Sequence, residues 1–246
     1  MILNEDYRRY KDYIENDSVN LIFADPPYGV TNLEYDKKPF DMGDFWDFCK
    51  NTLKKDGVVV VTCVMSFAVK VIESAPKGWF RYDLIWEKTS ATGHLNAKKR
   101  PMRAHEIILV FSPSGSHTYN PQMTHGHERK VSSAATKMKN VKSSGIYNKA
   151  DSYSNYDSTD RYPRSVQRFA SDKQKSSVHP NQKPIALLEW IIKTYSNEGD
   201  VIVDPVSGSG TTEIAAMRQR RKSICFEINK DYFDKSIERV KLYENH

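Results

Sequence analysis

A carboxylate, two prolines and a tyrosine stand directly after a run of apolar residues. The four are Asp25, Pro26, Pro27 and Tyr28, and the apolar run covers residues 19–24. Ligands of open α/β sheets bind beyond the carboxyl ends of strands, so a strand at 19–24 would place this tetrapeptide where chemistry is expected. Because proline fixes φ and Asp favours turns, the same residues could instead form only a rigid turn.

The chemistry suited to this motif is the activation of a nucleobase amino group. Such an amine is a poor nucleophile, because its lone pair is delocalised into the ring. The carboxylate of Asp25 and the carbonyl of Pro26 can accept hydrogen bonds from the two N–H groups of this amine. They can also stabilise the positive charge that builds on the nitrogen as a methyl group arrives. The ring of Tyr28 offers a stacking face worth roughly 1–3 kcal/mol, which helps to offset the cost of extruding a base from a duplex.

A second motif, rich in glycine and small polar residues, follows another apolar run. It comprises Asp204, Pro205, Val206, Ser207, Gly208, Ser209, Gly210, Thr211 and Thr212. Gly208 and Gly210 let the backbone approach a ligand closely. No lysine follows Gly210, which excludes a P-loop, and Glu213 would repel a pyrophosphate at the start of the following helix. A phosphate-free adenosyl cofactor is the ligand that remains.

Glu227 completes the candidate cofactor site. It follows the next apolar run, about 20 residues after Gly208, where a carboxylate can bind ribose hydroxyls. The alternative is an ordinary acidic residue at the start of a helix.

Strands and helices alternate around these motifs, which predicts an α/β fold with a doubly wound, mostly parallel sheet. We expect strands at residues 2–4, 19–24, 58–63, 80–86, 105–111, 201–203 and 223–226, and helices at 7–14, 44–55, 67–74, 184–195, 211–218 and 231–243. The strands at 80–86 and 105–111 are expected to pair as an antiparallel hairpin at the edge of the sheet.

The positive charge is concentrated in one segment. Residues 88–178 hold 16 Lys and Arg against 6 Asp and Glu, whereas the rest of the chain holds 21 against 25. Periodicity fades after Ser112, and Ser, Asn, Lys and Tyr take over. We therefore predict a basic insert at 89–178, with a core strand at 105–111, between two catalytic halves at 1–88 and 179–246. A solvated basic loop is the alternative.

Several other classes of protein are disfavoured. No apolar run approaches the roughly 20 residues that span a bilayer, and the start of the chain lacks the apolar core of a signal peptide, so we expect no membrane association and a cytoplasmic location. Cys49, Cys63 and Cys225 show no metal-binding spacing. The pair His125 and His127 lacks further ligands nearby, so we expect no metal.

The two motifs, in this order and with a basic insert between them, resemble the β group of DNA amino-methyltransferases of bacteria and phages. The resemblance covers nearly the whole chain. It implies a Rossmann-like fold, S-adenosyl-L-methionine as the cofactor, duplex DNA as the partner and methyl transfer to adenine N6 of a flipped-out base. Asp rather than Ser at position 25 favours adenine over cytosine N4. Methylation of cytosine N4 in DNA, methylation of adenine in RNA and a silent nucleic-acid-binding module remain as alternatives, and homodimerisation and a partner restriction endonuclease stay open.

The resemblance also implies roles for single residues. Asp6 matches an acidic residue that contacts the cofactor adenosine, although it could instead cap a helix. His179, Gln182 and Lys183 match the family's HPxQKP motif beside the cofactor's methionine end. Ala24 and Ile228, which flank the motifs, are also expected to bind the cofactor. The chain departs from the pattern at Val206, where the family has phenylalanine.

Lys88 and basic residues of the insert are candidates for phosphate contacts or for reading guanine edges. They are Lys88, Lys98, Lys99, Arg100, Arg103, Arg129, Lys130, Lys137, Lys139, Lys142, Arg161, Arg164 and Arg168. For any one of them taken alone, a plain surface charge is the favoured interpretation. The tyrosines of this region can stack on bases or anchor the insert; they are Tyr119, Tyr147, Tyr153, Tyr156 and Tyr162.

Overall fold

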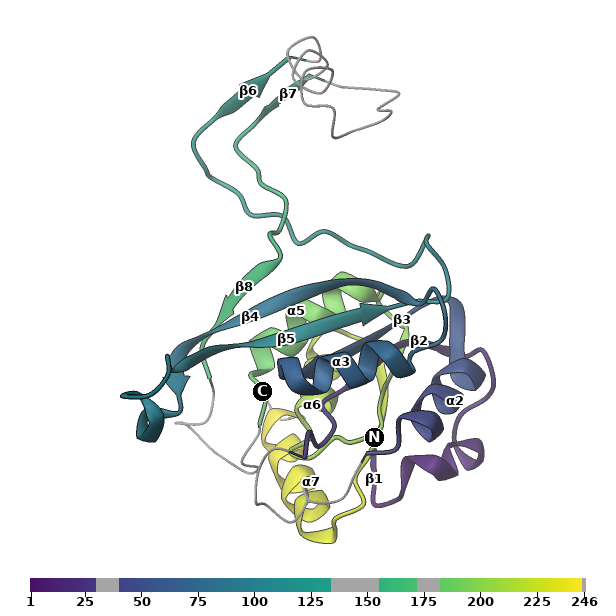
Figure 1. The fold of residues 1–246 in the computed structure, drawn as a ribbon. Helices are drawn as coiled ribbons and strands as arrows, with labels where there is room; N and C mark the ends of the chain where they lie inside the picture. The colour runs from purple at the N-terminus through teal and green to yellow at the C-terminus, as the bar shows by residue number, and fades with distance from the viewer. Residues whose placement is uncertain (30–39, 134–154, 172–181, 245–246) are drawn as a thin grey trace. The chain divides into compact units, whose positions relative to one another are not determined.

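The computed structural model describes residues 1–29, 40–133, 155–171 and 182–244 (Figure 1). The chain forms two compact units. The larger contains Met1–Asn120 and Ser165–His246, and the smaller contains Pro121–Arg164. The candidate active site lies entirely in the larger unit.

An eight-stranded sheet in the order β1-β10-β9-β2-β3-β5-β4-β8 forms the centre of the larger unit. Its strands are β1 (Ile2–Leu3), β2 (Val19–Ala24), β3 (Leu53–Cys63), β4 (Phe80–Thr92), β5 (Arg103–Phe111), β8 (Val166–Phe169), β9 (Val201–Asp204) and β10 (Lys222–Phe226). Among the described strands of this sheet, β5 alone runs antiparallel to its neighbours, which are β3 and β4. This arrangement confirms the predicted α/β class and the mostly parallel sheet with an antiparallel hairpin.

Five α-helices and two 3₁₀ segments accompany the described strands of this unit. They are η1 (Tyr7–Asp12), α2 (Met42–Thr52), α3 (Met65–Ser74), η2 (His94–Asn96), α5 (Ile185–Tyr195), α6 (Thr211–Arg218) and α7 (Lys230–Glu244). Residues 7–12 of the expected helical stretch form 3₁₀ turns. One local expectation was wrong: β3 already begins at Leu53, so residues 53–55 belong to a strand and not to the expected helix at 44–55.

Helices cover both faces of the sheet, which explains why its central strands are apolar on both sides. Ile22 of β2 belongs to a buried cluster that includes Phe45 of α2 and Phe67 of α3. Its neighbour Leu21 belongs to a second cluster, with Leu188 of α5. Successive side chains of a strand point to opposite faces, so β2 joins both cores.

The two sequence motifs leave adjacent strands at the same edge of the sheet. β2 and β9 are parallel neighbours, with Leu21 opposite Ile202 and Ile22 opposite Val203. Asp25 follows the end of β2, and Asp204 ends β9. The sheet order therefore brings together two loops that are far apart along the chain.

The boundaries of the expected insert differ from the units in the structure. Residues 89–178 contribute β5 and β8 to the main sheet, and only Pro121–Arg164 form a separate unit. β8 pairs in parallel with β4, and the indole N–H of Trp86 donates to the carbonyl of Phe169 at 3.1 Å. The predicted hairpin is consequently one strand away from the edge. The four residues of β8 lie in a polar stretch, which hid this strand from a pattern-based prediction.

The described part of the smaller unit contains two paired strands and several arginine contacts. β6 (Lys130–Ser132) pairs antiparallel with β7 (Tyr156–Ser158). The guanidinium of Arg129 donates to both carboxylate oxygens of Asp157, at 2.7 and 2.6 Å. Arg161 donates to the carbonyls of Ser158 and Asp160 at 3.1 and 2.7 Å.

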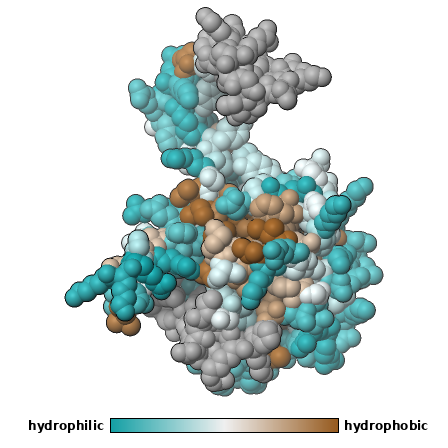
Figure 2. Space-filling model, viewed as in Figure 1, coloured by the Kyte–Doolittle hydropathy of each residue, from teal (hydrophilic) through white to brown (hydrophobic). Residues whose placement is uncertain are grey.

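One face of the larger unit exposes apolar side chains. Met65, Val69 and Ile72 of α3 are 63%, 48% and 39% exposed, and Figure 2 shows hydrophobic residues gathered over this helix.

Among the described residues, no helix is both long and apolar enough to cross a bilayer.

Candidate active site

A cleft of about 710 Å³ opens where β2, β9 and β10 end. Most of the residues that were expected to act in catalysis or to bind the cofactor line it. These are Asp6, Asp25, Pro26, Pro27, Gln182, Lys183, Asp204, Pro205, Val206, Ser207, Gly208, Ser209, Thr211, Thr212, Glu227 and Ile228. The two motifs thus share one cavity, as the sequence analysis requires.

Three of the expected residues support the cleft without lining it. Ala24 is fully buried in the core, and Gly210 precedes α6 in a left-handed conformation. Tyr28 packs its ring against Phe67 at a centroid distance of 5.5 Å. His179 lies outside the described residues.

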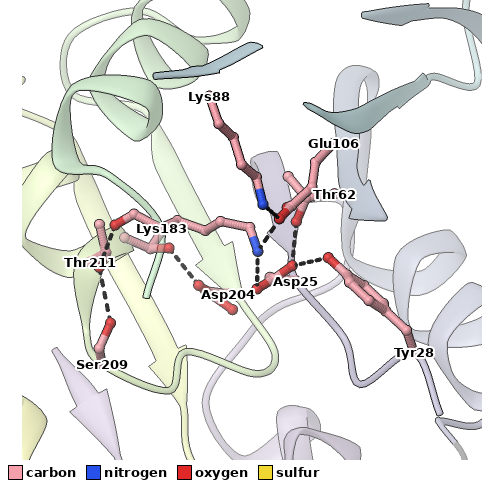
Figure 3. A network of polar contacts seen from close by, with 10 residues as sticks. Asp25, Tyr28, Thr62, Lys88, Glu106, Lys183, Asp204, Ser209 and Thr211 are labelled. Carbon is pink, nitrogen blue, oxygen red and sulfur yellow. Dashed lines mark hydrogen bonds and ion pairs between the residues drawn. The ribbon is translucent and has the colours of Figure 1, made fainter. Parts of the chain in front are cut away.

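The Asp25 carboxylate accepts hydrogen bonds on both of its oxygens (Figure 3). The hydroxyls of Tyr28 and Thr62 donate to Oδ1 at 2.5 and 2.6 Å. The Lys183 ammonium donates to Oδ2 at 2.6 Å. Three donors, from the loop after β2, from β3 and from the segment before α5, therefore fix the orientation of this carboxylate. Thr62 was not predicted, because only the pairing of β2 with β3 brings it to Asp25.

Lys183 joins Asp25 to a second buried carboxylate. Its Nζ lies 3.2 Å from Oε2 of Glu106, and the other oxygen of Glu106 pairs with Lys88. Burial disfavours the ammonium, but the carboxylates of Asp25 and Glu106 outweigh it and raise the pKa of Lys183. Burial likewise opposes ionisation of Glu106, but the two lysines outweigh it and lower the pKa of its carboxyl group.

The loop of residues 205–210 between β9 and α6, called the glycine loop below, is folded back onto the end of β10. The N–H of Gly208 donates to Oε2 of Glu227 at 2.8 Å, and the N–H of Asn229 donates to Oε1 at 2.8 Å. The N–H of Ser207 donates to the carbonyl of Phe226 at 2.9 Å. Burial raises the pKa of Glu227. Glu227 therefore holds the loop in place, in addition to facing the cleft.

Asp204 anchors the other side of this loop. The N–H of Val206 donates to its Oδ1 at 3.0 Å, and the Thr212 hydroxyl donates to its Oδ2 at 2.5 Å. Burial raises the pKa of Asp204 to about 7, and the nearby negative charge of Asp25 adds to the shift.

Asp6 has both of the properties considered for it. It caps η1 by accepting the N–H of Arg8 at 3.0 Å, and it also lines the cleft. Hydrogen bonds from the Arg8 side chain lower the pKa of Asp6. Asp6 therefore caps η1 and lines the cleft at the same time.

The cleft also contains residues that the sequence analysis missed. They are Glu5, Tyr7, Arg8, Phe23, Phe40, Asp41, Asp44, Leu188, Phe226, Asn229 and Tyr232. Phe226 could have been found, because it ends the strand before Glu227. Asp41 and Asp44 have no comparable signal, since no motif surrounds them.

The described lining is mainly acidic among its charged residues, with seven carboxylates against Arg8 and Lys183. Such a cleft favours a cationic ligand and disfavours a phosphate. Phe226, Val206 and Ile228 add apolar surface. The arrangement is suited to an adenosyl ligand that carries a positive charge, beside a carboxylate that can accept N–H groups.

The predicted cationic contacts fall into three groups. Lys98, Lys99, Arg100 and Arg103 are exposed on the β4–β5 hairpin, as is Arg168 on β8. Lys88 is instead half-buried and forms an ion pair with Glu106. Arg129 and Arg161 form hydrogen bonds within the smaller unit. Lys130 and Arg164 of the same unit are exposed. Lys137, Lys139 and Lys142 lie outside the described residues.

A family model described as DNA methylase of the N6 and N4 type matches residues 19–238. Among similar proteins, the type II methyltransferase M.HpaI of Haemophilus parainfluenzae is 28% identical over 239 residues, covering 92% of this chain and 69% of that protein. The DNA adenine methyltransferase YhdJ of Escherichia coli is 29% identical over 240 residues, covering 92% and 78%.

Solved structures share the fold. The complex of M1.HpyAVI with SAM superimposes with a TM-score of 0.66 at 21% identity, covering 98% of both chains. The cytosine-N4-specific PvuII DNA methyltransferase gives a TM-score of 0.67 at 18% identity, covering 99% of this chain and 90% of that one.

Proposed function

Because the chain belongs to the N6/N4 DNA methylase family, we propose that it transfers a methyl group from S-adenosylmethionine to N6 of adenine in DNA. The observation that carries this proposal is the position of Asp25. Its carboxylate stands in the same cleft as the glycine loop, and neighbouring side chains hold it in one orientation.

The residues of the cleft fit S-adenosylmethionine. Its sulfonium and ammonium groups suit an acidic lining, and it has no phosphate for that lining to repel. Asp204 and Glu227 flank the glycine loop from opposite sides. We expect Glu227 to bind the ribose hydroxyls and Phe226 to pack against the adenine, because both residues line the cleft. Gln182 and Asp6 complete the set of polar side chains that would hold the ligand.

Bound S-adenosylmethionine supplies an electrophilic methyl group. The protein aligns and polarises the acceptor. Asp25 and the carbonyl of Pro26 accept hydrogen bonds from the two N–H groups of the amine. These hydrogen bonds direct the lone pair of the nitrogen toward the methyl carbon. Thr62, Lys183 and Tyr28 keep Asp25 oriented through their hydrogen bonds. The ring of Tyr28 packs against Phe67 outside the lining of the cleft, so its support for the proposal is this hydrogen bond and not the stacking face expected from the sequence.

The choice of adenine rests on Asp at position 25, which the family resemblance associates with N6. The relatives of this chain include an adenine methyltransferase and a cytosine-N4-specific one. The test is nucleoside analysis by mass spectrometry after incubation with labelled S-adenosylmethionine and duplex DNA. N6-methyladenine supports the proposal, whereas N4-methylcytosine, or methylation of RNA alone, contradicts it.

The β4–β5 hairpin is the element that we expect to contact DNA. β4 is parallel to β3 and β2 within the sheet, so its carboxyl end lies at the same edge as Asp25. Beyond Lys88 the hairpin carries Lys98, Lys99, Arg100 and Arg103, and no acidic residue occurs up to Arg103. Such a strip of cations suits the phosphate backbone.

A further inference from the structure

Four charged side chains of alternating sign run from the cleft into the root of the β4–β5 hairpin. They are Asp25, Lys183, Glu106 and Lys88, and the side chains are only 16%, 7%, 12% and 15% exposed (Figure 3). We call them the charge quartet. Each member contacts the next, from Asp25 through Lys183 and Glu106 to Lys88.

The inner pair and the outer pair have different relations to the cleft. Asp25 and Lys183 line it, whereas Glu106 and Lys88 are not among the described residues of its lining. Glu106 therefore reaches the cleft only through Lys183. Burying a carboxylate is costly unless it is paired, and here both of its oxygens face an ammonium.

The net charge of the quartet is zero, and this matters for methyl transfer to an amine. Positive charge moves from the sulfonium to the acceptor nitrogen during the reaction, so the site must remain attractive to a cation. Lys183 orients Asp25 but cancels its charge. Glu106 restores one negative charge, and Lys88 offsets that charge in turn.

We propose that Glu106 is a positioning residue for methyl transfer, which holds the Lys183 ammonium against Asp25 and offsets its positive charge. This inference rests on the proposed function, because it concerns the same reaction. It assigns a role to a side chain that touches neither the donor nor the base.

Two single variants change the net charge in opposite directions. Glu106→Gln leaves the quartet with one excess positive charge, and Lys88→Gln leaves it with one excess negative charge. We expect Glu106→Gln to lower kcat about tenfold at saturating DNA, the size expected for one charge acting through a partly buried site. The double variant is neutral again, and we expect it to recover most of the lost kcat.

Binding without DNA provides a readout that is independent of activity. S-adenosylhomocysteine has the skeleton of S-adenosylmethionine without the methyl group and therefore without the sulfonium charge. Calorimetric Kd values for both ligands give an affinity ratio that loosened packing would leave unchanged. We expect the preference for S-adenosylmethionine to fall in Glu106→Gln, to rise in Lys88→Gln, and to return near the wild-type value in the double variant.

Glu87→Gln is the matched control, because it removes one negative charge from an exposed neighbour on the same hairpin. It should leave kcat and the affinity ratio within twofold of wild type. If Glu106→Gln does the same, or if the double variant is as impaired as Glu106→Gln, the proposal is wrong. Should Glu106→Gln fail to fold, Lys88→Gln alone decides, since an unchanged ratio there contradicts the proposal.

The proposed function is tested separately by the wild-type protein. If wild type does not methylate DNA, the proposed function fails whatever the variants show. If wild type methylates DNA and the variants do not change in the expected directions, only the role of Glu106 is overturned.

Discussion

Oε2 of Glu227 accepts the backbone N–H of Gly208 at 2.8 Å, across 19 residues of sequence. Glu227 thereby ties the end of β10 to the glycine loop. Its other oxygen is bonded to the N–H of Asn229. The carboxylate therefore shapes the loop as well as presenting acceptors to the cleft.

Glu227→Ala should weaken S-adenosylmethionine binding about 10- to 100-fold, since hydrogen bonds to a charged group are worth roughly 1.5–3 kcal/mol each. Isothermal titration calorimetry measures the change. Glu238→Gln, on the exposed side of α7, serves as the control and should bind like wild type. Unchanged affinity in Glu227→Ala would mean that the loop keeps its conformation and its ligand contacts without this carboxylate.

Asp25→Ala should abolish methyl transfer, with a loss of at least about 10²–10³-fold in kcat, because the group that accepts the amine N–H is removed. Binding of S-adenosylmethionine should stay nearly intact. Asp25→Asn keeps the shape and one acceptor oxygen for Thr62, and so tests charge separately from shape. Single-turnover methylation with labelled donor measures both variants, and retention of most activity in Asp25→Ala would refute the assignment.

The parts of the site that could be predicted are those tied to the end of a single strand. Asp25 and the glycine loop each follow an apolar run, so periodicity alone places them at the active edge. Thr62 and Glu106 meet Asp25 and Lys183 only because β3 lies beside β2 and β5 lies beside β3. Periodicity along the chain carries no information about which strands are neighbours.

The same limit applies to the fold: elements with a clear apolar pattern could be predicted, and strands placed by tertiary pairing could not. The long apolar strands and the helices were identified, whereas β8 was missed, because its pattern is short and polar. Its place in the sheet depends on pairing with β4 and on the contact of Trp86 with Phe169, both of which are tertiary interactions.

Affinity for S-adenosylmethionine should rise as the pH increases through 7. Burial raises the pKa of Asp204 to about 7, so in the ligand-free protein its carboxyl group is largely protonated below that pH. A cationic ligand favours the ionised form, so binding at pH 6 should release a proton that binding at pH 8 does not. Calorimetry in buffers of different ionisation enthalpy measures this proton release.

Asp204→Asn isolates this group from the other titrating residues and should lose the part of the pH dependence centred near 7. The same shift has a consequence for stability. A raised carboxyl pKa means that the folded protein binds more protons than the unfolded chain, so the stability contributed by Asp204 is lost as the pH rises from about 4 to 7. If the free energy of unfolding changes equally with pH in wild type and in Asp204→Asn, Asp204 does not titrate in this range.

Gly210→Ala should lower the free energy of unfolding by about 2–4 kcal/mol. Gly210 has φ +71°, and a Cβ at this position would lie 2.9 Å from Cδ1 of Ile2 and 3.2 Å from Cβ of Ser236. Gly78→Ala is the control, since Gly78 has φ +78° but no atom within 4 Å of the added Cβ. It should show only the conformational strain, about 1 kcal/mol. Urea unfolding measures both variants, and equal losses would mean that packing around Gly210 adjusts without cost.

Charge reversal of the β4–β5 hairpin should weaken duplex binding and flatten its salt dependence. In the variant Lys98, Lys99 and Arg100 are each replaced by Glu. The slope of log K against log salt concentration should fall by about 0.9 for each phosphate that is no longer neutralised, because fewer counterions are released on binding. Fluorescence anisotropy with labelled duplex, at several salt concentrations, measures the slope.

A control with the same change in net charge separates local contact from long-range attraction. Lys55, Lys193 and Lys222 are exposed near the opposite edge of the sheet, at the start of β3, the end of α5 and the start of β10. Replacing these three with Glu lowers the total charge equally, but should change the slope much less, since exposed charges beyond about 10 Å are screened at 0.1 M salt. If both variants flatten the slope equally, DNA responds to net charge alone and the hairpin does not contact the phosphates. If only the hairpin variant flattens it, the cations beyond Lys88 lie on the path of the DNA into the cleft that holds Asp25.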